Sequence, residues 1–196
     1  MDRWVQRGRD EWRRARDFGC LCDLGARFLV GDLGYFPGWA VAETDEESDG
    51  IQQVLVDLNR AGFLTLASGR GDPDRAGEDG RTERRRAFVL GFASDPMLIR
   101  LRDLGDEVWI RDFGAREQGG EPLPVGLRAN EVFLQVGEGA GELELEIFAA
   151  DVGEQALRDL EQRRYVILVG LDWGQDGSFW SALADVARSK DRGQSA

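Results

Sequence analysis

Histidine is absent from this 196-residue sequence, and lysine occurs only once, at Lys190. Without histidine, the chain lacks the commonest general base, the usual zinc ligand and the Ser-His-Asp triad. A single lysine also argues against a Walker A phosphate loop, in which lysine contacts the nucleotide phosphates. Contacts to an anion must therefore come from arginine side chains or from backbone N–H groups.

Cysteine and long apolar runs are also scarce. Cys20 and Cys22 form a C-x-C pair, which supplies two of the four ligands that a closed zinc site needs. No apolar run approaches the roughly 20 residues of a membrane span, and the first residues lack the apolar core of a signal peptide. We therefore expect a cytoplasmic protein that makes no contact with a membrane.

The charge is strongly unbalanced toward acid, with a net value of −12. This balance argues against direct nucleic-acid binding, because phosphate contacts need a basic surface. Two kinds of interaction remain compatible with this charge. The acidic surface could bind a cationic partner, or a local cluster of arginines could bind an anion. Hydrophobic residues make up 42% of the chain, which is enough for one domain with a sizeable core.

Apolar periodicity predicts six helices and six strands. The helices are expected at residues 2–18, 23–30, 51–61, 95–104, 152–163 and 178–188. The strands are expected at residues 63–67, 86–93, 107–113, 131–136, 142–148 and 165–171. The polar segments 68–83 and 114–129 are expected to be loops.

This order of elements predicts an α/β fold of the mixed α+β kind. We expect a single domain over residues 1–188, with a mixed sheet of about six strands and helices packed against it. Residues 1–18 form its charged N-terminal helix, and residues 189–196 form a disordered tail.

One helix–strand–loop unit gathers polar side chains, and it is the first candidate site. Ligands of α/β sheets bind beyond the carboxyl ends of the strands, where arginine forks and glycine-exposed backbone suit a phosphate, a nucleotide or a carboxylate. The candidate ligand-binding residues are Asn59, Arg60, Thr65, Ser68, Gly69, Arg70, Arg85 and Arg86. Alternatively, the polar residues cap the helix and the arginines pair with surface carboxylates.

Carboxylates form a second candidate, because two or three of them could converge on Mg²⁺ in a hydrolase. The carboxylates considered are Asp57, Asp112, Asp172, Glu142, Glu144 and Glu146. Their spacing is not diagnostic, and glutamates that alternate with apolar residues are typical of the outer face of a strand. We therefore assign no catalytic residue, metal ligand or cofactor.

Six tryptophans could include a stacking platform for a base, although tryptophan is more often a core or interface anchor. They are Trp4, Trp12, Trp39, Trp109, Trp173 and Trp180.

Four short segments carry a resemblance to a known family. Residues 24–31 follow its Leu-Gly pattern loosely, and residues 58–65 match its central motif. Residues 85–92 are similar to its Gln-Arg-Ala-x-Val-x-Gly-Phe pattern, and residues 172–183 are similar to its Trp-Gly and Trp-x-x-Leu elements. The chain thus resembles DUF6919, a family of unknown function from actinobacteria and their phages. Two polar positions depart from the family pattern: Arg85 replaces its Gln, and residues 68–71 replace its Ser-Gln-Pro-Gly turn.

The resemblance implies a fold and a compartment but no activity. We hypothesise a non-catalytic protein that binds an anionic, nucleotide-like small ligand, and the family's distribution suggests a role in phage counter-defence. One alternative is an acidic interaction module or DNA mimic that blocks a host protein. Another alternative is a carboxylate-dependent, magnesium-dependent hydrolase.

Overall fold

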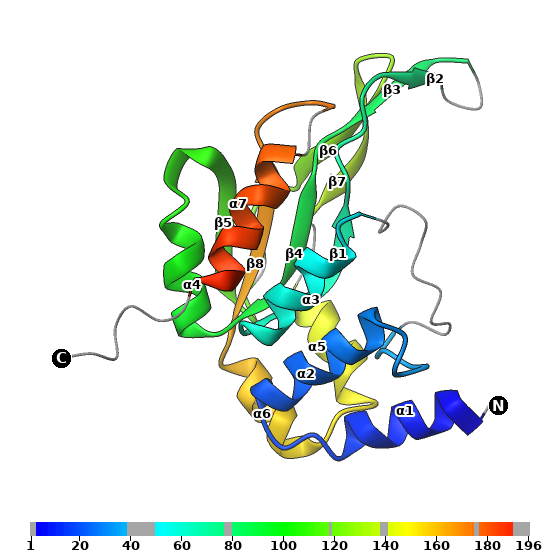
Figure 1. Ribbon diagram of the computed structural model, residues 1–196, viewed down its shortest axis with the longest axis vertical. Helices are drawn as coiled ribbons and strands as arrows, with labels where there is room; N and C mark the ends of the chain where they lie inside the picture. Colours follow the sequence, from blue (N-terminus) through cyan, green and yellow to red (C-terminus); the bar gives the residue numbers. More distant parts are fainter. Residues whose placement is uncertain are drawn as a thin grey trace.

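The computed structural model describes residues 3–38, 50–76, 80–117, 119–137, 141–174 and 177–189. Its centre is an antiparallel sheet with the strand order β1-β4-β8-β5 (Figure 1). These strands are β1 (Phe63–Gly69), β4 (Phe88–Ala93), β8 (Arg164–Gly170) and β5 (Val108–Gly114). The nearly continuous apolar sequences of β4 and β8 fit their central positions, where both faces are buried.

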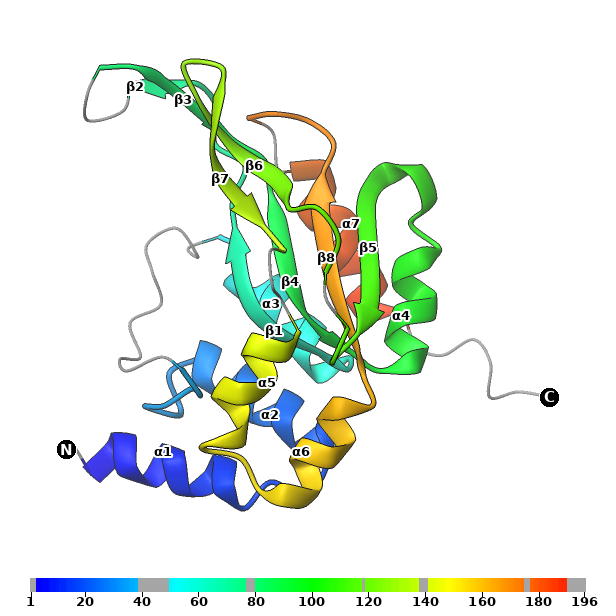
Figure 2. The same ribbon diagram turned by 180° about the vertical axis from the view of Figure 1, so that it is seen from behind.

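A second antiparallel sheet, in the order β2-β3-β6-β7, lies over one face of the first (Figure 2). Its strands are β2 (Arg75–Ala76), β3 (Thr82–Arg85), β6 (Leu123–Arg128) and β7 (Glu131–Val136). Only Arg86 and Ala87 separate β3 from β4, so the chain passes almost directly from the second sheet into the first. The Arg86 N–H donates to the Val125 carbonyl at 2.9 Å, and the Gly170 N–H donates to the Ala87 carbonyl at 2.8 Å. The crossover is therefore hydrogen-bonded to a strand of each sheet.

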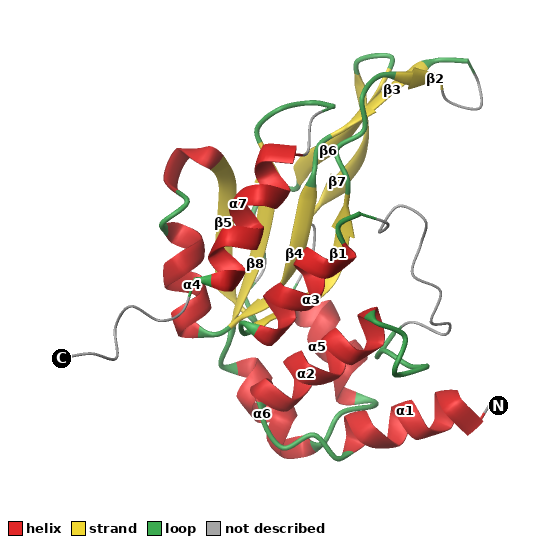
Figure 3. Ribbon diagram, viewed as in Figure 1, coloured by secondary structure: helices red, strands yellow, loops and turns green. Residues whose placement is uncertain are grey.

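The helices divide into two groups (Figure 3). On the other face of the central sheet lie α3 (Gln52–Arg60), α4 (Asp95–Arg102) and α7 (Gly177–Arg188). At one end of the sheet lie α1 (Arg3–Arg13), α2 (Phe18–Leu29), α5 (Glu142–Ala149) and α6 (Glu154–Glu161). A 3₁₀ turn, η2 (Gly105–Glu107), leads into β5.

Each face of the central sheet has its own apolar core. On the side of α3, α4 and α7, the core includes Leu58, Phe63 and Val166. The other core joins the end helices and the second sheet, and Trp12 is fully buried in it. The Trp12 ring meets those of Phe36 and Phe148 edge-on, with centroids 5.0 and 5.8 Å away. Such contacts add to the stabilisation that burial already gives.

A buried polar clip joins α3 to β1. The Asn59 side-chain amide donates to the Leu55 carbonyl at 2.8 Å and to Thr65 Oγ1 at 2.7 Å, and its Oδ1 accepts from the Thr65 N–H at 3.3 Å. Between these two residues the chain turns at Gly62, whose φ of +97° favours glycine. The clip satisfies polar groups that would otherwise be buried at a cost.

The mixed α+β class predicted from the sequence is confirmed, but the sheet arrangement differs. In the described part of the chain there are eight strands in two sheets, and every recorded pairing is antiparallel. The apolar runs of β4 and β8 reflect helices on one face and the second sheet on the other, rather than a parallel pairing.

The predicted strand at residues 142–148 is wrong, because this segment is the helix α5. Its alternation of Glu with Leu and Ile suits a strand, but Glu and Leu are also strong helix formers. In the helix, Leu145 and Phe148 lie three positions apart and are buried, whereas Leu143 is exposed. The buried residues are three positions apart, which is the spacing of one helix face. Tertiary packing therefore determines that this segment is a helix rather than a strand.

Two predicted loops contain strands. Segment 114–129 includes β6, which pairs with β7 through a two-residue turn at Ala129 and Asn130. Both turn residues have positive φ, +50° and +68°, as a tight hairpin requires. The turn carries neither Asn-Gly nor Asp-Gly, so its sequence gives no clear hairpin signal. Segment 68–83 likewise includes β2 and the start of β3.

The helix predicted at residues 2–18 ends earlier, at Arg13, and α2 begins earlier than residue 23. Asp17 caps α2 through its side chain, which accepts from the Cys20 N–H at 2.7 Å. Residues 190–196 of the predicted tail lie outside the described residues. Among the described helices, none has the length and apolar character needed to cross a membrane.

Candidate functional site

The structure distributes the eight predicted ligand-binding residues along β1, whose seven residues extend for about 20 Å at roughly 3.3 Å per residue. Asn59 and Arg60 lie where α3 leads into the strand, and Thr65 lies on its first half. The remaining five lie toward the opposite end of the strand: Ser68, Gly69, Arg70, Arg85 and Arg86.

Two of the three residues in the first group stabilise the fold. Asn59 and Thr65 are buried and hydrogen-bond to each other in the clip, while Arg60 is exposed at the end of α3. In the second group, a Cβ at Gly69 would lie 2.4 Å from the Phe88 ring, so close packing accounts for this glycine.

Arg70 belongs to a different surface from Arg86. It borders a groove of about 510 Å³ between α3 and α7, with Val54 and Trp180 among the lining residues. Arg86 lies on the side of the second sheet, because its N–H donates to the Val125 carbonyl of β6 while the neighbouring Ala87 is buried in the core of α3, α4 and α7. The sequence therefore grouped arginines that the fold separates.

Arg86 is the centre of an arginine–tryptophan stack, formed by Trp109, Arg86 and Trp173. The guanidinium carbon lies 4.3 Å from the Trp109 ring centroid and 4.2 Å from the Trp173 ring centroid. Both distances are well within the cation–π range of about 6 Å. With both rings in contact, Arg86 is only 9% exposed.

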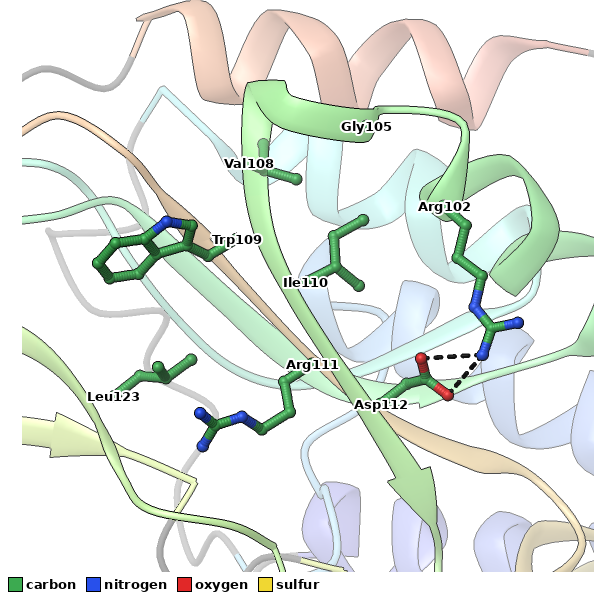
Figure 4. Close-up of a pocket in the computed structure, with 8 residues that line it drawn as sticks. All are labelled: Arg102, Gly105, Val108, Trp109, Ile110, Arg111, Asp112 and Leu123. Carbon is green, nitrogen blue, oxygen red and sulfur yellow. Dashed lines mark hydrogen bonds and ion pairs between the residues drawn. The ribbon is translucent and has the colours of Figure 1, made fainter.

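Three separate elements meet to build the stack. Trp109 is the second residue of the edge strand β5, and its side chain is visible in Figure 4. Arg86 is in the crossover between the sheets, and Trp173 is in the turn that follows β8. The Gly174 N–H donates to the Arg85 carbonyl at 3.0 Å, which ties that turn to the crossover. A backbone hydrogen bond thus holds together two of the three elements that carry the stack.

The Nε atom of Arg86 is buried and has no hydrogen-bond acceptor among the described residues. Burial lowers the pKa of Arg86, and the nearby carboxylate of Asp172 acts in the opposite direction. Arginine nevertheless stays charged at neutral pH, because its reference pKa is above 12. An arginine guanidinium donates paired N–H groups to a carboxylate or a phosphate.

Further arginines surround the arginine–tryptophan stack. Arg84 extends it by a weaker contact to the Trp173 ring, at 5.9 Å. Arg85 and Arg128 lie 5.9 and 4.9 Å from the Phe133 ring. Arg128 is also paired at 2.6 Å with Glu83, a buried carboxylate, which neutralises its charge. Arg84, Arg85 and Arg86 thus lie together in a protein whose net charge is −12.

The carboxylates singled out in the sequence are dispersed. Asp112 is bound by Arg102 and Arg164, each at 2.9 Å, and Asp57 accepts from Gln53 at 2.7 Å. The glutamates at positions 142, 144 and 146 lie on the helix α5 rather than on a strand. In the described part of the chain, no three His, Cys, Asp or Glu side chains are grouped to hold a metal ion.

Comparison with protein families gives a match over residues 7–189 to DUF6919, described as a domain of unknown function. The chain belongs to this family. Two stack residues lie in the segments through which the sequence resembles DUF6919. Arg86 is the arginine of its Gln-Arg-Ala pattern, and Trp173 is the tryptophan of its Trp-Gly element. No curated protein matches the chain.

Trp109 and Trp173 belong to the site but are not among the ligand-binding residues predicted from the sequence. Both are among its six tryptophans, but Trp39 lies outside the described residues and Trp12 and Trp180 are buried in the cores. Which tryptophans meet an arginine depends on the order of strands in the sheet. A single sequence contains no signal for that order.

Proposed function

We propose that this DUF6919 protein is a non-catalytic binding protein that holds an anionic, nucleotide-like small ligand at the arginine–tryptophan stack. The observation that carries the proposal is Arg86. The residue is nine-tenths buried, its guanidinium contacts two indole rings, and its Nε has no acceptor among the described residues.

Two physical effects favour an anion at this position. The indole rings help to exclude water from the guanidinium, and a hydrogen bond to a charged group is stronger where the local dielectric is low. The stack also holds the side chain in one orientation, so little conformational entropy is lost when a ligand binds. The planar edge of the guanidinium suits the two oxygens of a carboxylate or a phosphate.

The exposed part of Trp109 favours a ligand that also has an aromatic ring. One face of its indole is covered by Arg86, yet the residue remains 42% exposed. A base stacked on an aromatic side chain contributes about 1–3 kcal/mol. An anionic group at Arg86 with a base on Trp109 describes a nucleotide.

A role in phage counter-defence follows if the bound nucleotide is a defence signal that the protein sequesters. The cytoplasm is the compartment in which such a ligand would be met. This part of the proposal depends on the distribution that the family resemblance implies, and its test is the identity of the ligand.

Calorimetric titration of the full-length protein with inorganic phosphate, mononucleotides and cyclic nucleotides tests the proposal. We expect at least one of these anions to bind the wild type. We expect Arg86→Gln to weaken that binding about 10- to 100-fold, because a hydrogen bond to a charged group is worth about 1.5–3 kcal/mol. Arg60→Gln is the matched control, since Arg60 is an exposed arginine at the opposite end of β1.

Unfolding curves without ligand show whether each variant is folded at the titration temperature. The proposal is overturned if the whole panel fails to bind the wild type, or if Arg86→Gln and Arg60→Gln bind with equal affinity.

A further inference from the structure

The free edge of β5 is a second feature of the central sheet. This strand is last in the order β1-β4-β8-β5, and its seven residues pair with β8 on one side. Among the described residues, no strand pairs with its other side. Every second residue of an edge strand directs its N–H and C=O groups outward, where another extended chain can bind them.

Side chains border this edge on both sides. In Figure 4, Trp109, Arg111 and Leu123 lie on one side of β5, and Ile110, Asp112 and Arg102 lie on the other. Together they line a groove of about 580 Å³ that follows the strand. This volume is in the range of about 300–1,000 Å³ that is typical of ligand sites.

Both walls of the groove are anchored. The Arg111 guanidinium donates to the Glu121 carbonyl, which ties this side of the groove to the segment before β6. On the other side, Arg102 donates to both oxygens of Asp112, at 3.0 and 2.9 Å. The groove therefore keeps its shape, and among the described residues no strand pairs with the backbone edge between its walls.

The charge of the groove selects the partner. Its lining carboxylate, Asp112, is already neutralised by Arg102 and Arg164. Arg111 is the lining arginine that Asp112 does not neutralise, so the groove is cationic although the whole protein is acidic. Between the charges, Trp109, Ile110 and Leu123 supply apolar surface.

We propose that the free edge of β5 binds an extended, acidic segment of a partner protein, which joins the central sheet as a fifth strand. Main-chain hydrogen bonds supply affinity in this mode, and the alternating side chains supply specificity. An acidic residue of the segment lies beside Arg111. Two positions along, on the same face, an apolar residue packs against Trp109 and Leu123. This peptide site shares Trp109 with the anion site and does not include Arg86.

The test is a selection from a degenerate library of eight-residue peptides on the immobilised full-length protein. We expect enrichment of peptides with an acidic residue two positions from a β-branched or aromatic residue. In fluorescence anisotropy, a selected peptide should bind Arg111→Glu at least tenfold more weakly than wild type. Arg158→Glu reverses an exposed arginine on α6 and should bind like wild type.

Two further measurements separate strand addition from other modes of binding. Hydrogen exchange should show new protection of the alternate, outward-facing amides within residues 108–114 with a selected peptide, and N-methylation of alternate peptide amides should abolish binding. The proposal is overturned if the library shows no enrichment, if Arg111→Glu binds normally, or if the N-methylated peptide still binds. A dimer whose β5 amides are protected without peptide contradicts it as well, since a second copy would then occupy the edge.

Discussion

Replacing Asn59 with alanine tests whether this residue belongs to the fold rather than to a ligand site. The substitution removes three hydrogen bonds, at 2.8, 2.7 and 3.3 Å, to Leu55 and Thr65. The Leu55 carbonyl keeps its place in the α3 helix, but the buried Thr65 N–H loses its acceptor. An unsatisfied buried group costs about 1–3 kcal/mol, and each lost bond costs about 1 kcal/mol. We therefore expect Asn59→Ala to lower the free energy of unfolding by about 3 kcal/mol.

Urea unfolding followed by circular dichroism measures this change, and Thr65→Val is its matched partner. Valine keeps the shape and the backbone N–H but removes Oγ1, so the expected loss is about 1 kcal/mol. Because the two side chains share a bond, the double variant should lose less than the sum of the single losses. A loss below about 0.5 kcal/mol for Asn59→Ala would refute the reasoning. So would a large fall in anion affinity of the folded variant.

Three further predictions concern other parts of the molecule. Burial raises the pKa of Asp151, but hydrogen bonds from Tyr35 and an α1 arginine outweigh it and hold the pKa below its usual range. Such stabilisation is present above the unfolded pKa of about 3.9 and is lost as the pH falls through the folded pKa. The stability advantage of wild type over Asp151→Asn in urea should therefore shrink below about pH 4, and a constant difference would contradict this. Burial also raises the pKa of Cys22, so a thiol reagent should modify the half-buried Cys20 first and Cys22 only after unfolding. In Gly91→Ala the new Cβ would lie 2.0 Å from a β1 carbonyl oxygen, so thermal unfolding should show a loss of about 3 kcal/mol, and a near-normal transition would be the contrary result.

The sequence predicts best those elements whose local signals agree with their packing. The unit of α3, Gly62 and β1 has an amphipathic helix, a glycine where φ is positive and an apolar strand. Likewise, α4 begins with Ser94, whose side chain accepts from the Met97 N–H, and it has proline in its first turn. At such places every level of the sequence indicates the same structure.

Other elements depend on information that is not local. The α5 segment suits a strand or a helix equally, and the burial of Leu145 and Phe148 decides between them. The β6–β7 hairpin turns at Ala129 and Asn130, which give no recognisable turn signal. The candidate site could be predicted only in part, because Arg86 is in the predicted set but its two partners depend on strand order.

The most direct test of the anion site follows the Nε–H group of Arg86 in a ¹H–¹⁵N NMR spectrum of the arginine side chains. This group is buried beside two indole rings, and Arg86→Lys identifies its signal by removing it. If Arg86 binds the anion, titration with the tightest ligand from calorimetry shifts this signal progressively to saturation, while the Arg60 signal stays in place. If instead the Arg86 signal does not move at saturating ligand, the anion is bound elsewhere and the central claim is contradicted.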